Sequence, residues 1–328
     1  MKREEFTKVL GQMVSLTALQ RKKLTQQLEE TQTEQEAANK EIPPAVAEAD
    51  PEQCPHCGHD ELGKWGNASG LQRWRCKDCK KTFNALTGTP LARLRKKEKW
   101  LDNADAMIAG ETIERTAELC GVHPNTAFRW RHRFLDCQKR AQSQDLAGIA
   151  ECDETYFYRS EKGSKNLQRR PRKRGGDKIK RGSKELVPVI TLRDRSGHGA
   201  DRVALDGVPP YIKDLFNQHL LEDTLLITDG KRSLCAGAKK RGKGSHVRVL
   251  GKEARGKKGE PYHTQTVNAF HSMLKGWMTR FRGVATKYLA NYVGWHRHLT
   301  EGHHRNDPNL FIQLAFNPLA VNQQLKVI

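Results

Sequence analysis

The sequence predicts a multidomain α+β protein, in which two small modules precede a larger α/β domain built on a mixed sheet. Three observations support this fold class. Two close cysteine pairs occupy the first third of the chain, three short helix patterns follow them, and strand patterns then alternate with helix patterns. The length of 328 residues corresponds to about two to three domains of ordinary size.

The cysteine pairs read Cys-Pro-His-Cys and Cys-Lys-Asp-Cys. Two residues between paired cysteines allow a tight turn to aim both thiolates at one ion, and two such turns complete a tetrahedral zinc site. Disulfides are the alternative, but no signal-like or membrane-length apolar stretch opens the chain, so zinc is favoured. Residues 53–90 are therefore predicted to form a zinc ribbon with the ligands Cys54, Cys57, Cys76 and Cys79.

The net charge predicts a polyanionic partner. The chain carries 58 Lys and Arg against 38 Asp and Glu, a formal charge of +20. The excess lies in two segments, Arg159–Lys184 and Lys231–Lys258. Neither segment has the apolar stripe of an interfacial helix, which excludes a membrane surface as the expected partner and favours nucleic acid. The alternative is a pair of solvated charge runs.

The ends of the chain carry weaker signals. Residues 1–30 place apolar side chains at roughly helical spacing and are predicted to be an N-terminal helical segment. Residues 31–52 are rich in Gln, Glu and Ala, contain Pro43-Pro44, and are predicted to be a linker. Residues 307–328 are assigned to a C-terminal tail.

Residues 91–140 are predicted to form a helix-turn-helix DNA-binding domain. Its helices are expected over Lys99–Ala109, Ile113–Cys120 and Pro124 to about Leu135. Gly121 just past the second helix and Pro124 at the start of the third are the usual residues at helix ends. The spacing matches a helix-turn-helix.

In that geometry the third helix enters the major groove of DNA. Ala127, Trp130 and Phe134 are expected to pack inward. An ordinary three-helix connector with a solvated basic face is the alternative, but the position behind a zinc ribbon favours DNA. The residues expected to face DNA are Asn125, Thr126, Arg129 and Arg133.

Residues 148–306 are predicted to form the α/β domain. Helices are expected near Tyr211–His219 and from Thr264 to about Phe281. Three strands in hairpin order precede alternating helix and strand, and a long helix closes the domain, which is the element order of an RNase H-like fold. The expected strands are Ile149–Tyr158, Glu185–Arg193, Ala200–Leu205, Thr224–Thr228 and Val247–Leu250.

Two aspartates stand out in this order. The first strand carries Asp153 and the fourth ends in Asp229. The first and fourth strands are neighbours in an RNase H-like sheet, so the two carboxylates are expected to lie close together. Paired carboxylates repel each other and are stabilised by bridging divalent cations. Paired Mg²⁺ ions about 4 Å apart can activate a water or a DNA 3′-hydroxyl for attack on a phosphodiester.

Three motifs resemble those of bacterial insertion-sequence DDE-type transposases of the ISXO-like group. They are Glu151-Cys-Asp-Glu-Thr, Ile227-Thr-Asp-Gly and His263-Thr-Gln-Thr-Val-Asn-Ala-Phe-His-Ser-Met-Leu-Lys275. The similarity extends from about Cys54 to Asn306, including the order of zinc ribbon and helix-turn-helix. By this resemblance, Asp153 and Asp229 match the first two metal ligands. Asn268 matches the third, which is most often glutamate in DDE enzymes. Lys275 lies two turns further on the same helix face, where its ammonium is expected to hold a DNA phosphate near the metals, and a solvated surface lysine is the alternative.

The resemblance implies a DNA transposase that binds the terminal inverted repeats of an insertion sequence. It implies Mg²⁺-dependent strand cleavage and strand transfer, with Mn²⁺ as an alternative metal. The expected partner is double-stranded DNA at element ends and target, bound by a homo-oligomer at the nucleoid in the bacterial cytoplasm. Two alternatives stay open: a non-catalytic DNA-binding regulator derived from a transposase, and an RNase H-like nuclease of repair or recombination.

Asn268 departs from the usual acidic third ligand. An amide oxygen coordinates Mg²⁺ without adding charge, so metal binding is expected to be weaker. Three outcomes follow: Asn268 acts as a neutral ligand, Glu154 or Glu260 supplies the missing charge, or the copy is inactive. The first is preferred because the rest of the helix motif is intact. For His271 a place on the helix surface is preferred, and a role in supporting the metal ligands is the alternative.

Overall fold

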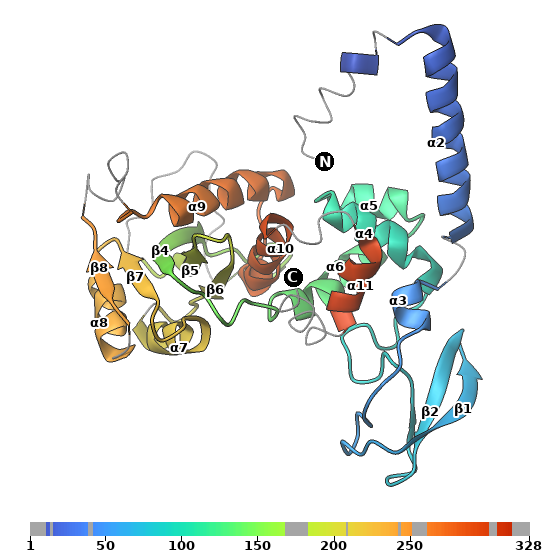
Figure 1. Cartoon of the computed structure of the whole chain (residues 1–328), viewed down its shortest axis with the longest axis horizontal. Coiled ribbons are helices and arrows are strands. Elements are labelled where there is room, and N and C mark those ends of the chain that lie inside the picture. Colours follow the sequence, from blue (N-terminus) through green and yellow to red (C-terminus); the bar gives the residue numbers. More distant parts are fainter. Residues whose placement is uncertain are drawn as a thin grey trace. The chain divides into compact units, whose positions relative to one another are not determined.

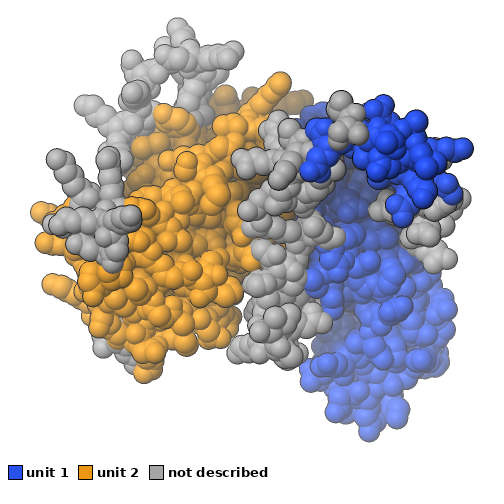
Figure 2. Space-filling model, turned by 45° about the horizontal axis from the view of Figure 1, so that its top comes forward, with its two compact units in different colours: residues 1–134, 304–317 blue, residues 135–303, 318–328 orange. Residues whose placement is uncertain are grey.

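The computed structural model describes residues 11–13, 16–38, 42–167, 183–207, 209–241, 244–250, 261–301 and 307–316. The chain divides into two compact units, one drawn from residues 1–134 and 304–317 and the other from residues 135–303 and 318–328 (Figure 2). None of the helices among the described residues is long and apolar enough to cross a membrane.

The first unit contains a small antiparallel sheet of β1 (Leu62–Ala68), β2 (Leu71–Cys76) and β3 (Thr82–Phe83), in that order. β1 and β2 are joined by Ser69 and Gly70, both with positive φ (52° and 74°), as a two-residue hairpin turn requires. The buried cluster of this sheet consists of Cys54, Trp74, Cys76 and Phe83. This core is small, and half of it is cysteine.

Three helices follow, α4 (Trp100–Ile108), α5 (Ile113–Leu119) and α6 (Pro124–Gln138). They confirm the predicted helix-turn-helix elements, with α6 continuing past the predicted end. The α5 helix is capped by the Thr112 hydroxyl, which accepts a hydrogen bond from the Arg115 N–H. The residues predicted to face inward are indeed buried: Ala127, Trp130 and Phe134.

Helices of this unit also occupy parts of the predicted linker and of the predicted tail. The α2 helix (Ala18–Ala38) runs into the predicted linker, because Gln, Glu and Ala favour helix. The α11 helix (Pro308–Phe316) lies in the predicted C-terminal tail. It buries Phe311 and Ile312 and contacts α4 and the short α3 (Pro44–Ala47). An isolated helix of this length is marginal, so packing rather than local sequence stabilises α11.

The second unit is built on a five-stranded sheet in the order β6-β5-β4-β7-β8. β4 is antiparallel to β5, and β5 to β6, whereas β4, β7 and β8 run parallel. This is the predicted arrangement, in which the first strand of the domain neighbours the fourth. The strands are β4 (Ile149–Tyr158), β5 (Leu186–Asp194), β6 (Gly199–Val203), β7 (Leu225–Thr228) and β8 (His246–Arg248).

Helices cover both faces of this sheet. On one face α7 (Pro209–His219) and α8 (Arg232–Arg241) share an apolar core with β4, β5, β6 and β7. On the other, α9 (Gln265–Met278) contacts β4 and β5, and α10 (Leu289–Thr300) contacts β6. Figure 1 shows α9 and α7 on opposite sides of the sheet. Strand alternation therefore decides which side chains of β4 face α9.

The face covered by α9 and α10 is unusually polar. Buried Arg193 pairs with Glu301 at 2.9 Å and lies 3.7 Å from the centroid of the Phe270 ring. Buried Arg297 pairs with Asp201. Such contacts are directional, and removing one partner leaves an uncompensated buried charge. They fix how the two helices lie on the sheet.

His296 on α10 predicts an acid-sensitive fold. Its buried ring lies against Phe270 and Trp277, with centroids 5.0 Å and 5.3 Å away. Burial, followed by the guanidinium groups of Arg193 and Arg280, lowers the pKa of His296 to about 3. The folded state keeps the ring neutral, whereas the unfolded chain takes up a proton below about pH 6.5. Stability is therefore lost as the pH falls from about 6.5 towards 3.

The free energy of unfolding should depend less steeply on pH in His296→Gln. We expect its slope to fall by up to about 1.4 kcal/mol per pH unit between about pH 6 and 4, which corresponds to one proton. Urea unfolding of wild type and variant across this range measures the two slopes. Equal slopes would contradict the assignment.

Candidate metal centres and nucleic-acid interface

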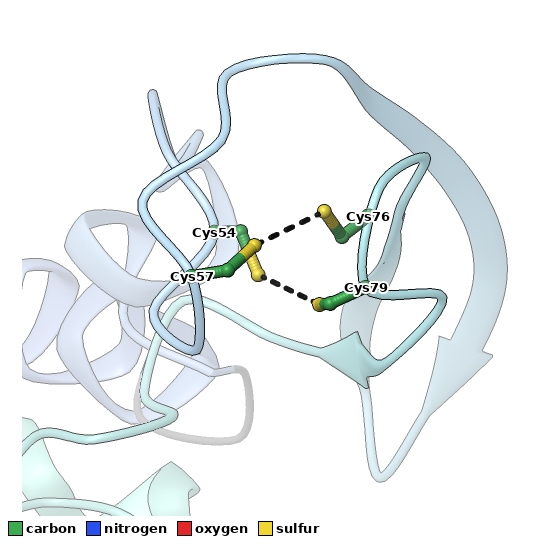
Figure 3. Close-up of side chains that lie close together, drawn as sticks. All are labelled: Cys54, Cys57, Cys76 and Cys79. Carbon is green, nitrogen blue, oxygen red and sulfur yellow. Dashed lines mark hydrogen bonds between the residues drawn. The ribbon is translucent and has the colours of Figure 1, made fainter.

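The four predicted cysteine ligands lie together in the first unit (Figure 3). Cys54 and Cys57 precede β1, Cys76 ends β2, and Cys79 lies in the turn to β3. The sulfurs of Cys54 and Cys79 are 3.6 Å apart, as are those of Cys57 and Cys76, and all four lie within 4.8 Å of one another. Zn–S bonds of about 2.3 Å in a tetrahedron place sulfurs about 3.8 Å apart. The cluster fits that ion.

Backbone geometry aims these thiols inward. The N–H of Gly58 donates to the carbonyl of Cys54 at 2.8 Å, and Gly58 adopts a φ of 79°. In the second turn the N–H of Cys76 donates to the carbonyl of Lys81 at 3.1 Å. Sulfur separations of 3.6 Å are far longer than the roughly 2.05 Å of a disulfide. The cysteines are thus arranged around a common point rather than joined in pairs.

The two aspartates come together through strand register in the second unit. Cys152 of β4 is the partner of Thr228 of β7 in a parallel pair, so Asp153 and Asp229 follow at the same end of adjacent strands. The Asp153 carboxylate accepts the N–H of Glu154 at 2.8 Å. These two carboxylates form the candidate site for divalent cations.

The electrostatics around Asp153 and Asp229 favours a bound cation. Burial and then the nearby Asp229 carboxylate raise the pKa of Asp153 to about 7, against the hydrogen bond from the Glu154 N–H, which lowers it. The side chain of Asp153 is only 18 % exposed. Two carboxylates held together with little solvent repel each other, and oxygen-ligated Mg²⁺ relieves that repulsion.

The α9 helix supplies the remaining predicted residues. Asn268 is exposed in the first turn, and its amide donates to the Thr264 hydroxyl at 3.2 Å. Lys275 is also exposed, two turns further on. Both residues are accessible from solvent.

His271 lies where the sequence analysis did not place it. It was expected on the helix surface, but it is buried, with Nδ1 4.0 Å from Asp153 Oδ2. Burial, then Lys275 and Arg193, lowers the pKa of His271 to about 4, so the ring is neutral at neutral pH. The physical reason is the packing of α9 against β4, which the helix sequence alone does not specify. Asn268, one turn earlier, lies on the same helix face.

Glu151 anchors α9 and was also missed. Its Oε2 accepts the N–H of Val267 at 2.9 Å, and its Oε1 lies 2.9 Å from Arg195 and 3.3 Å from His263. This carboxylate is fully buried two residues before Asp153, on the same face of β4. A glutamate inside a strand pattern that is otherwise buried was the available signal.

Glu154 was considered as an acid that supplies charge to the metal site, but its side chain pairs with a lysine. Its carboxylate lies 2.8 Å from Lys231 Nζ, and strand alternation puts it on the opposite face of β4 from Asp153. It is therefore directed to Lys231 instead of supplying a third acidic ligand beside Asp153. The other acid considered, Glu260, lies outside the described residues.

The predicted DNA-facing residues of α6 are unequally accessible. Asn125 and Arg129 are exposed, Thr126 is half-buried, and half-buried Arg133 donates to the carbonyl of Ala92 at 3.5 Å. Phe128, which was not among the predicted residues, is 41 % exposed on this helix. An aromatic residue next to Arg129 in the predicted third helix was the available signal.

A helix-turn-helix beside a cysteine cluster, followed by a mixed sheet with paired aspartates, defines a DNA-binding protein with a candidate centre for divalent metal. Residues 145–295 match the ISXO2-like transposase domain family, and residues 91–141 match a homeodomain-like domain family. The chain is also 28 % identical over 258 residues to an uncharacterized protein in transposable element ISH50 of Halobacterium salinarum, covering 73 % of this chain and 82 % of that protein. These matches place an ISXO2-like transposase domain and a homeodomain-like domain in the chain, and together with the similarity to the ISH50 protein they support an insertion-sequence transposase.

Proposed function

We propose that this transposase binds the terminal inverted repeats of its element and catalyses Mg²⁺-dependent DNA strand cleavage and strand transfer. The observation that carries the proposal is the register that sets Asp153 beside Asp229 under α9, within the segment that matches the transposase domain. We further propose that residues 148–306 act as an RNase H-like catalytic domain.

Asp153, Asp229 and the amide oxygen of Asn268 would hold Mg²⁺, with Mn²⁺ as an alternative. Ions held there would activate a water or a DNA 3′-hydroxyl and stabilise the leaving oxygen. Asn268 adds no charge, so the two carboxylates carry the attraction. Lys275, on the exposed side of α9, is suited to hold a DNA phosphate near the aspartates.

The four cysteines would hold structural zinc. Four thiolates complete the tetrahedron and leave no open position for substrate. Zinc would therefore shape the DNA-binding part of the chain and take no part in strand cleavage. Residues 53–90 and 91–140 would then act as two DNA-binding modules.

We propose that α6 reads DNA through Asn125, Thr126, Arg129 and Arg133. Arg129→Ala is expected to weaken binding to the element ends by about 1–3 kcal/mol, roughly 5- to 160-fold, if the guanidinium contacts a base edge. Fluorescence anisotropy with labelled element ends at fixed salt measures this loss. Arg115→Ala is the matched control, because Arg115 is exposed on α5 and pairs with Glu118 at 2.7 Å. Equal affinity of Arg129→Ala and wild type would contradict the role.

The activity itself is tested with supercoiled donor DNA that carries cloned element ends. We expect nicking and strand transfer in Mg²⁺ and neither when Ca²⁺ replaces it. Calcium is preferable to a chelator, because a chelator would also strip the cysteine site. Cleavage that persists without Mg²⁺ or Mn²⁺ would contradict the proposed chemistry.

A second candidate is a non-catalytic DNA-binding regulator derived from a transposase. The neutral Asn268 at the third ligand position favours it. This function predicts specific binding to the element ends without cleavage in any divalent metal.

For the transposase we expect a homo-oligomer on paired ends, acting at the nucleoid in the bacterial cytoplasm.

A further inference from the structure

We propose that Glu154 and Lys231 form a positioning pair that holds the two metal-binding aspartates at a set separation. The inference rests on the proposed role of Asp153 and Asp229 as metal ligands. It adds two residues that bind neither metal nor DNA in this scheme. They act by joining the two segments of chain that carry the ligands.

A chain of three contacts links the two aspartates across the adjacent strands. The N–H of Glu154 donates to the Asp153 carboxylate at 2.8 Å, and the N–H of Lys231 donates to the Asp229 carboxylate at 3.0 Å. The side chains of Glu154 and Lys231 then meet at 2.8 Å. Each aspartate is therefore oriented by the backbone N–H of the pair residue that follows it, and the side chains of the two pair residues contact each other. A shift of either segment would strain both carboxylates together.

The pair is built into the fold. The side chain of Glu154 is 2 % exposed and that of Lys231 is 33 % exposed, and Lys231 Nζ also donates to the hydroxyl of Tyr156 at 2.6 Å. A buried carboxylate is costly without such a partner. The side chain of Glu154 lies on the face of β4 opposite to Asp153, so the pair leaves the metal face clear.

Gly230 makes this chain of contacts possible. It lies between Asp229 and Lys231 with a φ of 83°, and a Cβ there would meet Leu250 Cδ2 at 2.4 Å. This conformation is open to glycine and rare for other residues. It turns the chain directly after β7, so that the Lys231 amide reaches back to Asp229 while its side chain reaches Glu154.

Lys231→Met distinguishes a positioning role from a purely electrostatic one, because the two roles predict opposite changes in metal affinity. Removing a cation beside a metal site should strengthen metal binding if charge alone matters. If the pair positions the ligands, the same variant should bind metal more weakly. Groups that orient metal ligands are typically worth about 10- to 100-fold in metal affinity, and we expect about tenfold.

The measurement is a Mn²⁺ titration of the zinc-loaded full chain without DNA, followed by the electron paramagnetic resonance signal of free Mn²⁺. We expect Lys231→Met to bind Mn²⁺ about tenfold more weakly and to need about tenfold more Mg²⁺ for half-maximal cleavage. Cleavage at saturating Mg²⁺ should largely recover. Unchanged or tighter Mn²⁺ binding by Lys231→Met overturns the positioning role.

Two further variants guard against misfolding. Glu154→Gln with Lys231→Met removes both charges and leaves no unpaired buried carboxylate. Because the residues act as one unit, this double variant should bind Mn²⁺ no more weakly than whichever of the single variants Lys231→Met and Glu154→Gln binds it more weakly. Fully additive losses would contradict the pair. Lys240→Met, at an exposed lysine of α8, is the control and should match wild type.

Asp153→Asn distinguishes the two levels of the proposal. If Mn²⁺ binding does not depend on Asp153, the proposed function fails and the pair fails with it. If binding depends on Asp153 but Lys231→Met retains the wild-type affinity, the pair alone is overturned.

Discussion

Asp153→Asn and Asp229→Asn are each expected to abolish Mg²⁺-dependent nicking of supercoiled DNA that carries the element ends. We expect a loss of at least about 10³-fold, equivalent to about 4 kcal/mol of transition-state stabilisation. The reason is that the proposed site draws its negative charge from these two aspartates, since Asn268 adds none, so each substitution halves that charge. Nicking rates at several Mg²⁺ concentrations measure the effect.

The fold should survive these changes. Removing one of two repelling, partly buried carboxylates leaves the metal-free protein as stable as before or more stable. A thermal unfolding curve checks this for each variant. Asp214→Asn, at an exposed aspartate of α7, is the matched control and should nick at the wild-type rate. Full activity in either site variant would reject the assignment of that aspartate.

Asn268→Asp changes the same site in the opposite direction. It restores a third negative charge, so half-maximal cleavage should require less Mg²⁺. If the Mg²⁺ dependence of this variant equals that of wild type, Asn268 is not a ligand. The variant thus separates a neutral ligand from a bystander on the helix.

Cys57→Ser is expected to unfold the ribbon and to remove specific DNA binding. The buried cluster around β1, β2 and β3 contains two of the four cysteines beside Trp74 and Phe83, so little apolar core is left without an ion. Structural zinc contributes about 10 kcal/mol or more to domains of this kind, far more than the ribbon can spare. The second unit, with its own apolar core, should stay folded.

Zinc content, tryptophan fluorescence and anisotropy with labelled element ends follow this loss together. Cys235→Ser is the control, because Cys235 lies on α8 near Thr228 and outside the cysteine cluster. It should retain one zinc per chain. A Cys57→Ser protein that keeps both stoichiometric zinc and wild-type DNA affinity would show that the cluster is not a structural zinc site.

Local patterns in the sequence determine much of this protein. The spacing within Cys54–Cys57 and Cys76–Cys79 predicts the cluster, because a knuckle is built from neighbouring residues. The helix ends around Gly121 and Pro124 predict α5 and α6 for the same reason. Strand and helix order predicts that Asp153 and Asp229 end on adjacent strands, a neighbourhood that the register of β4 and β7 then displays.

The rest depends on contacts between residues far apart in sequence. His271 against Asp153 and Lys231 against Glu154 are set by packing between separate elements, and no periodicity in either segment encodes the partner. The α11 helix likewise depends on burial against α4. The sequence by itself therefore determined the kinds of module, their order and the residues able to bind metal. Only the tertiary structure decided which side chains contact those candidate ligands, because long-range packing and not local spacing brings them together.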